Sequence, residues 1–133
     1  MRRHFDHIDL RVPRLSEATH FYETLLPVLG FSRRVDVEGW LQFETQNGGV
    51  EQFFGVTESA HFAANENRIA FAAQDKAEVD TLARIVTEAG ARNVEGPMEY
   101  EAGYYALFFE DPFGNRFEIC HRDRNAPAFP ATV

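Results

Sequence analysis

The chain repeats one pattern of secondary structure along its length. Each half predicts a strand, a helix and then three strands, and the pattern restarts after a polar stretch. When the halves are aligned, His7 falls on Arg68 and Phe21 falls on Leu82. Helix register, strand order and terminal hairpins agree together, which an internal duplication explains better than chance. The repeat therefore limits the fold to two similar βαβββ modules.

In the first half, alternating polarity predicts a half-buried strand over residues 4–12. Apolar residues at helical spacing predict a helix that Ser16 caps and Gly30 ends. An Asn47-Gly48 turn precedes the last of three further strands, which are expected at residues 31–37 (weakly), 40–45 and 50–56.

In the second half, a strand is expected just after Asn67, and Asp75 with Glu78 predicts a capping box at the start of a helix. Gly96-Pro97 interrupts the next strand, which is therefore weak. Two aromatic-rich strands follow, and the sequence DPFGN between them is typical of a hairpin turn. These last three strands are expected at residues 93–100, 104–109 and 116–121.

The length of 133 residues fits one domain with a real core, and 44% of the residues are hydrophobic. We expect module one at about 4–56, a linker at about 57–67, module two at about 68–122 and a loose tail at 123–133. The net charge of −8 disfavours nucleic acid and anionic membranes as partners. A single cysteine fits a reducing cytoplasm, and no signal peptide or membrane span is visible.

Glu118 lies in mid-strand, on the face opposite Phe117 and Ile119. A carboxylate at such a position needs a cation, a metal or a substrate as its partner. Strand phase places His7 and Arg68 on the same concave side, so the three groups are expected to form a shared site.

The motifs HFYETLLPVLGF and DPFGNRFE, within a tandem βαβββ repeat, resemble those of the vicinal oxygen chelate superfamily. This group includes glyoxalase I, extradiol dioxygenases, fosfomycin-resistance proteins and bleomycin-binding proteins. The resemblance covers roughly residues 4–122. It implies an α+β fold in which the modules curl into a mixed-sheet funnel with helices outside, and it implies a homodimer.

The resemblance also implies metal ligands at three positions. The first-strand histidine falls on His7, the last-strand glutamate on Glu118, and a fourth-strand glutamate of some branches on Glu51. The family's fifth-strand histidine is replaced by Arg68. A guanidinium cannot ligate a metal and repels a nearby cation, so Arg68 is expected to pair with Glu118 instead.

Two kinds of site therefore remain open. We favour a metal-free site in which Glu118 and Arg68 are the catalytic candidates, with Arg68 holding a substrate carboxylate or phenolate. The alternative is a divalent metal (Zn, Ni, Fe or Mn) that acts as a Lewis acid, with His7, Glu51 and Glu118 as its ligands. Arg68 could also do no more than neutralise Glu118.

Aromatic side chains on the predicted strands suit a flat ligand, although core packing explains any single one as well. Only alternate residues of a strand can face inward. The candidates for substrate binding are Trp40, Phe53, Tyr104 and Tyr105.

Two function classes follow from the resemblance. The first is an enzyme, a lyase, isomerase or dioxygenase acting on an oxygen-rich or aromatic small molecule. The second is a metal-free ligand-sequestering protein of the bleomycin-resistance type. Glyoxalase I activity is disfavoured because Arg68 replaces a ligand, and a regulatory subunit is a third possibility.

Overall fold

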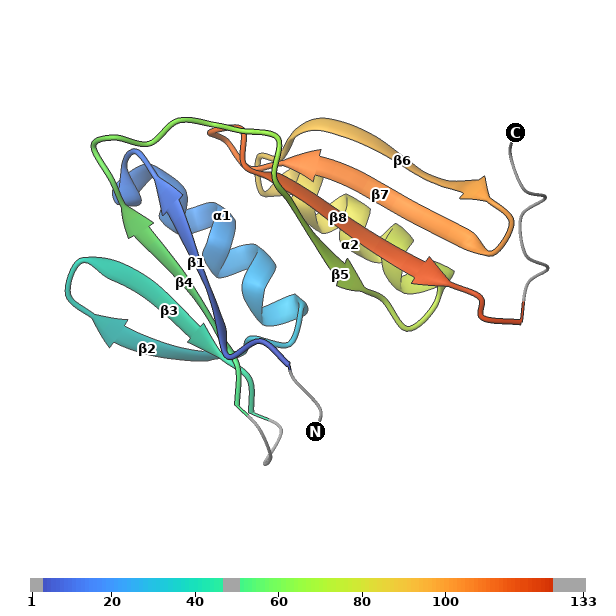
Figure 1. Cartoon of the computed structure of the whole chain (residues 1–133), viewed down its shortest axis with the longest axis horizontal. Helices are drawn as coiled ribbons and strands as arrows, with labels where there is room; N and C mark the ends of the chain where they lie inside the picture. Colours follow the sequence, from blue (N-terminus) through green and yellow to red (C-terminus); the bar gives the residue numbers. More distant parts are fainter. Residues whose placement is uncertain (1–3, 47–50, 126–133) are drawn as a thin grey trace. The chain divides into compact units, whose positions relative to one another are not determined.

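A computed structural model of the chain describes residues 4–46 and 51–125. The chain divides into two compact units, unit 1 (Met1–Ala64) and unit 2 (Asn65–Val133), and each is described by itself (Figure 1). Neither helix in the described part of the chain has the length and hydrophobicity of a membrane span.

Unit 1 has one helix and a four-stranded mixed sheet in the order β1-β4-β3-β2. β1 pairs with β4 in parallel, and the other neighbours pair antiparallel. The elements are β1 (His7–Val12), α1 (Leu15–Val28), β2 (Arg33–Val37), β3 (Trp40–Glu44) and β4 (Phe53–Glu58).

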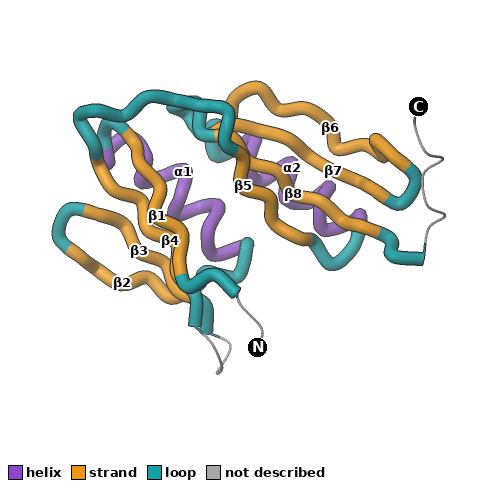
Figure 2. The backbone as a smooth tube through the Cα atoms, in the orientation of Figure 1, coloured by secondary structure: helices purple, strands orange, loops and turns teal. Residues whose placement is uncertain are grey.

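Unit 2 repeats this plan with the order β5-β8-β7-β6, in which β5 and β8 are the parallel pair (Figure 2). Its elements are β5 (Arg68–Ala72), α2 (Lys76–Glu88), β6 (Arg92–Glu101), β7 (Tyr104–Glu110) and β8 (Arg116–Arg122). The predicted α+β class and tandem βαβββ modules are confirmed. The two sheets are separate and not closed into a barrel, and a funnel, which would need both modules together, stays a prediction.

Each sheet buries one face against its own helix. In unit 1, Phe54 on β4 stacks with Tyr22 of α1 at 6.2 Å between ring centroids, and both are fully buried. In unit 2, Phe117 on β8 stacks with Phe109 of β7 at 5.5 Å, and Val79 and Val86 of α2 are fully buried in the same unit. In Figure 1, α2 lies behind β7 and β8, which leaves the other face of the sheet uncovered by it.

The two helix starts differ from each other. The predicted cap of the helix in unit 2 is confirmed at Asp75, whose carboxylate accepts a hydrogen bond from the backbone N–H of Glu78 at 2.8 Å. The return bond of the capping box is displaced by one residue, because the Glu78 side chain accepts the N–H of Gln74 at 3.2 Å. The predicted cap at Ser16 is wrong. The N-cap of α1 lies two residues earlier, at Arg14, and the Arg14 side chain makes no capping hydrogen bond. The side chain of Glu58 instead accepts the N–H of Leu15 at 3.0 Å.

The turn between β7 and β8 forms as expected, with Gly114 at φ 97°. The buried Asp111 side chain holds it by accepting the backbone N–H groups of Phe113 and Asn115 at 2.8 and 2.9 Å. The turn predicted at Asn47-Gly48 lies outside the described residues.

Two strand predictions need correction. The fourth strand begins at Phe53 rather than at residue 50, and it continues to Glu58 into the expected linker. The strand β6 is not broken at Gly96, although its pairing with β7 shifts register around it. Gly96 has φ +84°, and a Cβ there would lie 2.7 Å from the carbonyl oxygen of Ala106. Only glycine therefore fits at this position of the strand.

Candidate functional site

The pairing of β5, β8 and β7 decides which side chains share the face of the unit 2 sheet that α2 does not cover, here called the open face. Phe117 and Ile119 are buried in the core and therefore point to the helix. Glu118 lies between them and faces the other way, and its neighbours in register are Ala70 on β5 and Phe108 on β7. Because partners in register share a face, Glu118 and Phe108 lie side by side on the open face.

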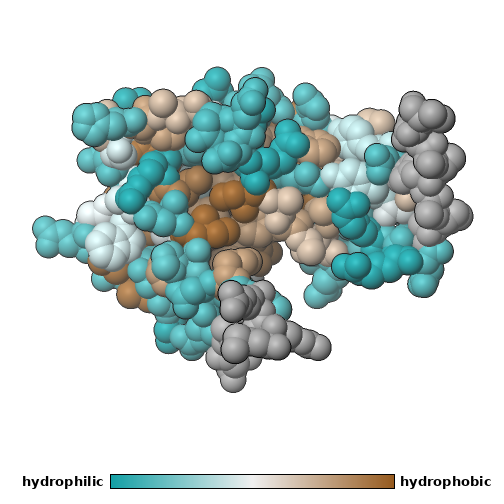
Figure 3. Space-filling model, in the orientation of Figure 1, coloured by the Kyte–Doolittle hydropathy of each residue, from teal (hydrophilic) through white to brown (hydrophobic). Residues whose placement is uncertain are grey.

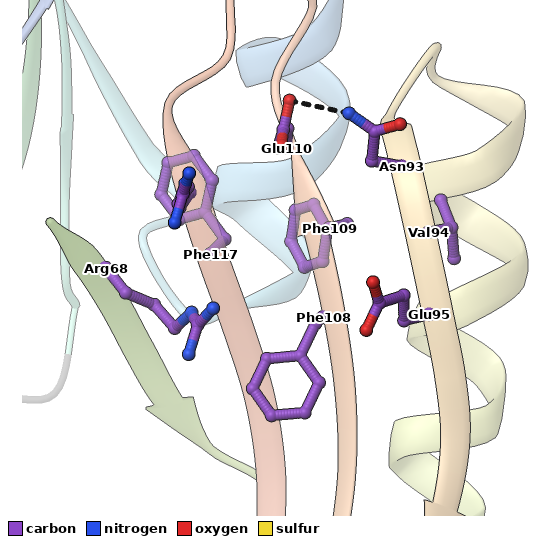
Figure 4. Close-up of a pocket in the computed structure, with 9 residues that line it drawn as sticks. Arg68, Asn93, Val94, Glu95, Phe108, Phe109, Glu110 and Phe117 are labelled. Atoms are coloured by element: carbon purple, nitrogen blue, oxygen red, sulfur yellow. Dashed lines mark hydrogen bonds between the residues drawn. The ribbon is translucent and has the colours of Figure 1, made fainter. Parts of the chain in front are cut away.

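A pocket of about 530 Å³ lies on the open face of unit 2 (Figure 4). Arg68 reaches from β5 to the ring of Phe108, and its guanidinium carbon lies 4.7 Å from the ring centroid. Such a cation–π contact contributes roughly 0.5–1 kcal/mol at an exposed site. The lining residues that bear on function are Arg68, Asn93, Glu95, Phe108, Glu110 and Arg116.

The cations of this pocket are left available for a ligand. Arg68 and Arg116 are partners in register on β5 and β8. Among the ion pairs of the described residues, none includes either guanidinium. Two guanidinium groups on neighbouring strands form a site that attracts anionic oxygens.

Glu118 is 7% exposed, and its partner is not Arg68, which the sequence predicted, but Tyr104. The hydroxyl of Tyr104 on β7 donates to the Glu118 carboxylate. No ion pair joins Arg68 to Glu118 within residues 4–46 and 51–125. The expected ion pair between Arg68 and Glu118 is therefore absent. Tyr104 donates the hydrogen bond that the Glu118 carboxylate accepts, and the Arg68 side chain extends past Glu118 to the ring of Phe108.

Burial and the hydrogen bond to Glu118 both raise the pKa of the Tyr104 hydroxyl well above its ordinary value. Burial also raises the pKa of the Cys120 thiol, and the Glu118 carboxylate adds to that effect. Tyr104 and Cys120 therefore stay protonated at neutral pH, and Tyr104 acts as a hydrogen-bond donor. Arg122 closes this cluster with its guanidinium carbon 4.2 Å from the Tyr104 ring centroid.

The two adjacent tyrosines have opposite roles. Tyr104 lies on the open face, but Tyr105 points to the helix. The Tyr105 hydroxyl donates to the Asp80 carboxylate of α2 at 2.6 Å, and Lys76 lies over its ring at 5.6 Å. Because side chains alternate along the strand, Tyr105 does not lie on the open face. It joins the sheet to the helix α2 instead.

In unit 1, a groove of about 300 Å³ lies on a sheet face and is aromatic. The rings of His7 and Phe53 stack in parallel at 4.4 Å, with 3° between their planes. Trp40, 38% exposed, lies in the same groove and donates its indole N–H to Gln42 at 3.0 Å. Three predicted site residues, His7, Trp40 and Phe53, are therefore brought together.

Glu51 does not belong to this groove. His7 is in register with Phe53, just as Arg68 is with Arg116, so Gly55 and not Glu51 is the counterpart of Glu118. Glu51 precedes β4 and lies 3.7 Å from the guanidinium of Arg33. The predicted alignment of Glu51 with Glu118 is therefore wrong by four residues, because Gly55 is the residue that corresponds to Glu118.

The metal that the resemblance implies does not fit the side chains at these positions. Within the described residues, no group of three His, Cys, Asp or Glu side chains is arranged to hold a metal ion. Gly55 supplies no ligand at the fourth-strand position, and Arg68 supplies none at the fifth-strand position. We therefore derive no chemistry through a metal.

Of the six lining residues named above, only Arg68 was identified from the sequence; the five that were missed are Asn93, Glu95, Phe108, Glu110 and Arg116. Phe108 and Arg116 share the strand phase of Tyr104 and Glu118, so alternation alone could have found them. Glu95 carried no such signal, because β6 was expected to be broken at Gly96.

The hydrogen bond between Tyr104 and Glu118 has a measurable consequence. Tyr104→Phe leaves the buried carboxylate without its donor, so we expect the free energy of unfolding to fall by about 1–3 kcal/mol. Urea denaturation measures this loss. Tyr100→Phe is the matched control, since its hydroxyl has no hydrogen bond within the described chain and a change below about 0.5 kcal/mol is expected. Equal effects of the two variants would contradict the assignment.

The sequence profile of the Glyoxalase/Bleomycin resistance protein/Dioxygenase superfamily matches residues 4–119. No curated protein matches the sequence. Several solved structures share the fold.

A glyoxalase/bleomycin resistance protein from Albidiferax ferrireducens T118 has a TM-score of 0.72 and 24% identity, over 90% of this chain and 98% of that one. The fosfomycin resistance protein FosX from Mesorhizobium loti has a TM-score of 0.67 and 21% identity, over 93% and 96%. FosX from Listeria monocytogenes, complexed with Mn(II) and sulfate, has a TM-score of 0.68 and 20% identity, over 93% and 94%. The profile match covers most of the chain, which therefore belongs to the Glyoxalase/Bleomycin resistance protein/Dioxygenase superfamily.

Proposed function

We propose that the chain binds a small oxygen-rich molecule without the help of a metal, and that the pocket of unit 2 holds the anionic group of that molecule. The observation that carries this proposal is the position of Arg68. Its guanidinium lies over the ring of Phe108 in the pocket and makes no ion pair with a described residue. An arginine in this state offers paired N–H donors to a carboxylate, phosphonate or enolate.

The dimensions and surface of the pocket support a ligand of this class. A volume of about 530 Å³ lies within the range of roughly 300–1,000 Å³ that is usual for small-molecule sites. Hydrophilic and neutral residues dominate the surface over β6 and β7 in the space-filling view (Figure 3). The ring of Phe108 offers an apolar surface against which the body of the ligand can pack.

The aromatic groove of unit 1, taken by itself, is a second candidate binding site, suited to a flat ligand. Its charged residues neutralise each other, since Asp9 and Arg11 form an ion pair at 3.0 Å. Trp40, Phe53 and His7 therefore offer ring surface rather than net charge. We propose that this groove binds an aromatic or planar ligand of its own.

A sequestering protein of the bleomycin-resistance type fits these features, because binding needs the pocket and no reacting group. A specific observation also favours an enzyme. Glu118 is almost buried, and Tyr104 fixes its carboxylate by a hydrogen bond. A carboxylate held in this way is suited to accept a proton from a bound substrate, as a general base in a lyase or isomerase.

The family resemblance supports two further proposals about the intact protein. We propose that it forms a homodimer and that it works in the cytoplasm, in keeping with its single cysteine. Size-exclusion chromatography with light scattering tests the first of these.

The anion site predicts the behaviour of one variant. Arg68→Gln removes the guanidinium, so the affinity for 3-phenylpropanoate or phenylphosphonate is expected to fall about tenfold. NMR titration in the presence and absence of EDTA measures this change, and EDTA should have no effect on the wild type. Arg84→Gln, which removes an equal charge from the exposed surface of α2, is the control. Unchanged affinity in Arg68→Gln, or loss of binding in EDTA, would contradict the proposal.

The enzymatic candidate predicts turnover that depends on Glu118. A panel of catechols, 2-oxoaldehydes and epoxides is to be assayed with wild-type protein and with Glu118→Gln. Loss of a general base lowers the rate by roughly 10²–10⁴-fold, so Glu118→Gln should be nearly inactive on any member that the wild type converts. If the wild type binds members of the panel and converts none, the sequestering function is supported and the enzyme is rejected.

A further inference from the structure

The pocket of unit 2 is lined by carboxylates as well as by guanidinium groups. Glu95 on β6 is in register with Phe108 on β7, so the two side chains share the open face. Figure 4 shows the Glu95 carboxylate turned toward Phe108 from one side while Arg68 reaches that ring from the other. A single aromatic ring thus lies between charges of opposite sign.

Glu95 makes no hydrogen bond or ion pair with another described residue that would satisfy its charge. The other carboxylate of the pocket differs, because Glu110 accepts a hydrogen bond from the side-chain amide of Asn93 at 3.0 Å. Arg68 and Glu95 do not pair with each other either, since no contact within 4.0 Å joins them. The ring of Phe108 keeps the two charges apart, and each is available to a ligand.

The signs of the lining charges balance. Arg68 and Arg116 supply two cations, and Glu95 and Glu110 supply two carboxylates. A purely anionic ligand would be attracted by the arginines and repelled by the glutamates, and a purely cationic ligand would meet the reverse. A ligand that carries both charges satisfies both sides of the pocket at once.

We propose that the natural ligand of this pocket is zwitterionic. Its oxyanion lies at Arg68, its ammonium group lies at Glu95, and its apolar body packs on Phe108. This inference rests on the proposed binding function and adds to it the ligand class and a specificity-determining residue, Glu95. Molecules of the size and charge pattern of an aromatic amino acid have this chemistry.

A matched series of probes separates this inference from the proposed function. L-phenylalanine carries both charges, 3-phenylpropanoate carries only the carboxylate, and phenethylamine carries only the ammonium group. We expect wild-type protein to bind L-phenylalanine at least about threefold more tightly than either other probe, as NMR titration would measure. If L-phenylalanine and 3-phenylpropanoate bind equally, the zwitterion is rejected while the anion site stands. If none of the three binds, both proposals fail.

Glu95→Gln tests the residue itself. This variant is expected to bind L-phenylalanine roughly three- to fivefold more weakly and 3-phenylpropanoate no more weakly than the wild type does. The control is Glu101→Gln, which removes the same charge from the same strand at a residue outside the pocket lining. Glu95→Gln with unchanged affinity for L-phenylalanine would overturn the assignment, and thermal denaturation confirms that both variants are folded.

Discussion

The parallel pairing of β5 with β8 is the constraint on which the rest of unit 2 depends. It places Arg68 beside Arg116 and Ala70 beside Glu118, and it sends Phe117 and Ile119 into the core. A shift by one residue would bury the charged groups and expose the aromatic ones, at a cost of several kcal/mol per buried charge. The apolar contacts with α2 therefore fix the register, and the register assembles the pocket.

The same pairing in unit 1 produces a different surface from the same plan. His7 and Phe53 stand where unit 2 has Arg68 and Arg116, and Gly55 stands where it has Glu118. The core positions stay alike, with Phe54 and Val56 as buried as Phe117 and Ile119. The two modules thus share their packing and differ on the sheet face away from the helix, which is aromatic in unit 1 and charged in unit 2.

Much of the fold could be predicted from the sequence because its signals are local. Strand alternation, the Asp75 cap and the turn held by Asp111 each depend on residues within a few positions of one another. Ser16 was mistaken for the cap because the N-cap lies two residues earlier, at Arg14. The group that accepts the Leu15 N–H is Glu58, which is distant in sequence.

The site was predicted less well, since its contacts join different strands. Strand phase correctly put Arg68 and Glu118 on one face, but it could not show that Tyr104 would satisfy Glu118. The length of the Arg68 side chain lets it reach past the neighbouring strand β8 to Phe108 on β7. Glu51 was misplaced because the start of β4 depends on its pairing with β1 and not on its own sequence.

We propose that Arg68, which stands where the family resemblance implies a metal ligand, makes this position an anion site. The most direct test is the transition-metal content of protein purified without chelators, measured by mass spectrometry beside the variant Arg68→His. We expect far less than one ion per wild-type chain, and a higher affinity for Mn(II) or Zn(II) in Arg68→His. One tightly held Mn, Zn, Ni or Fe ion in each wild-type chain would contradict it.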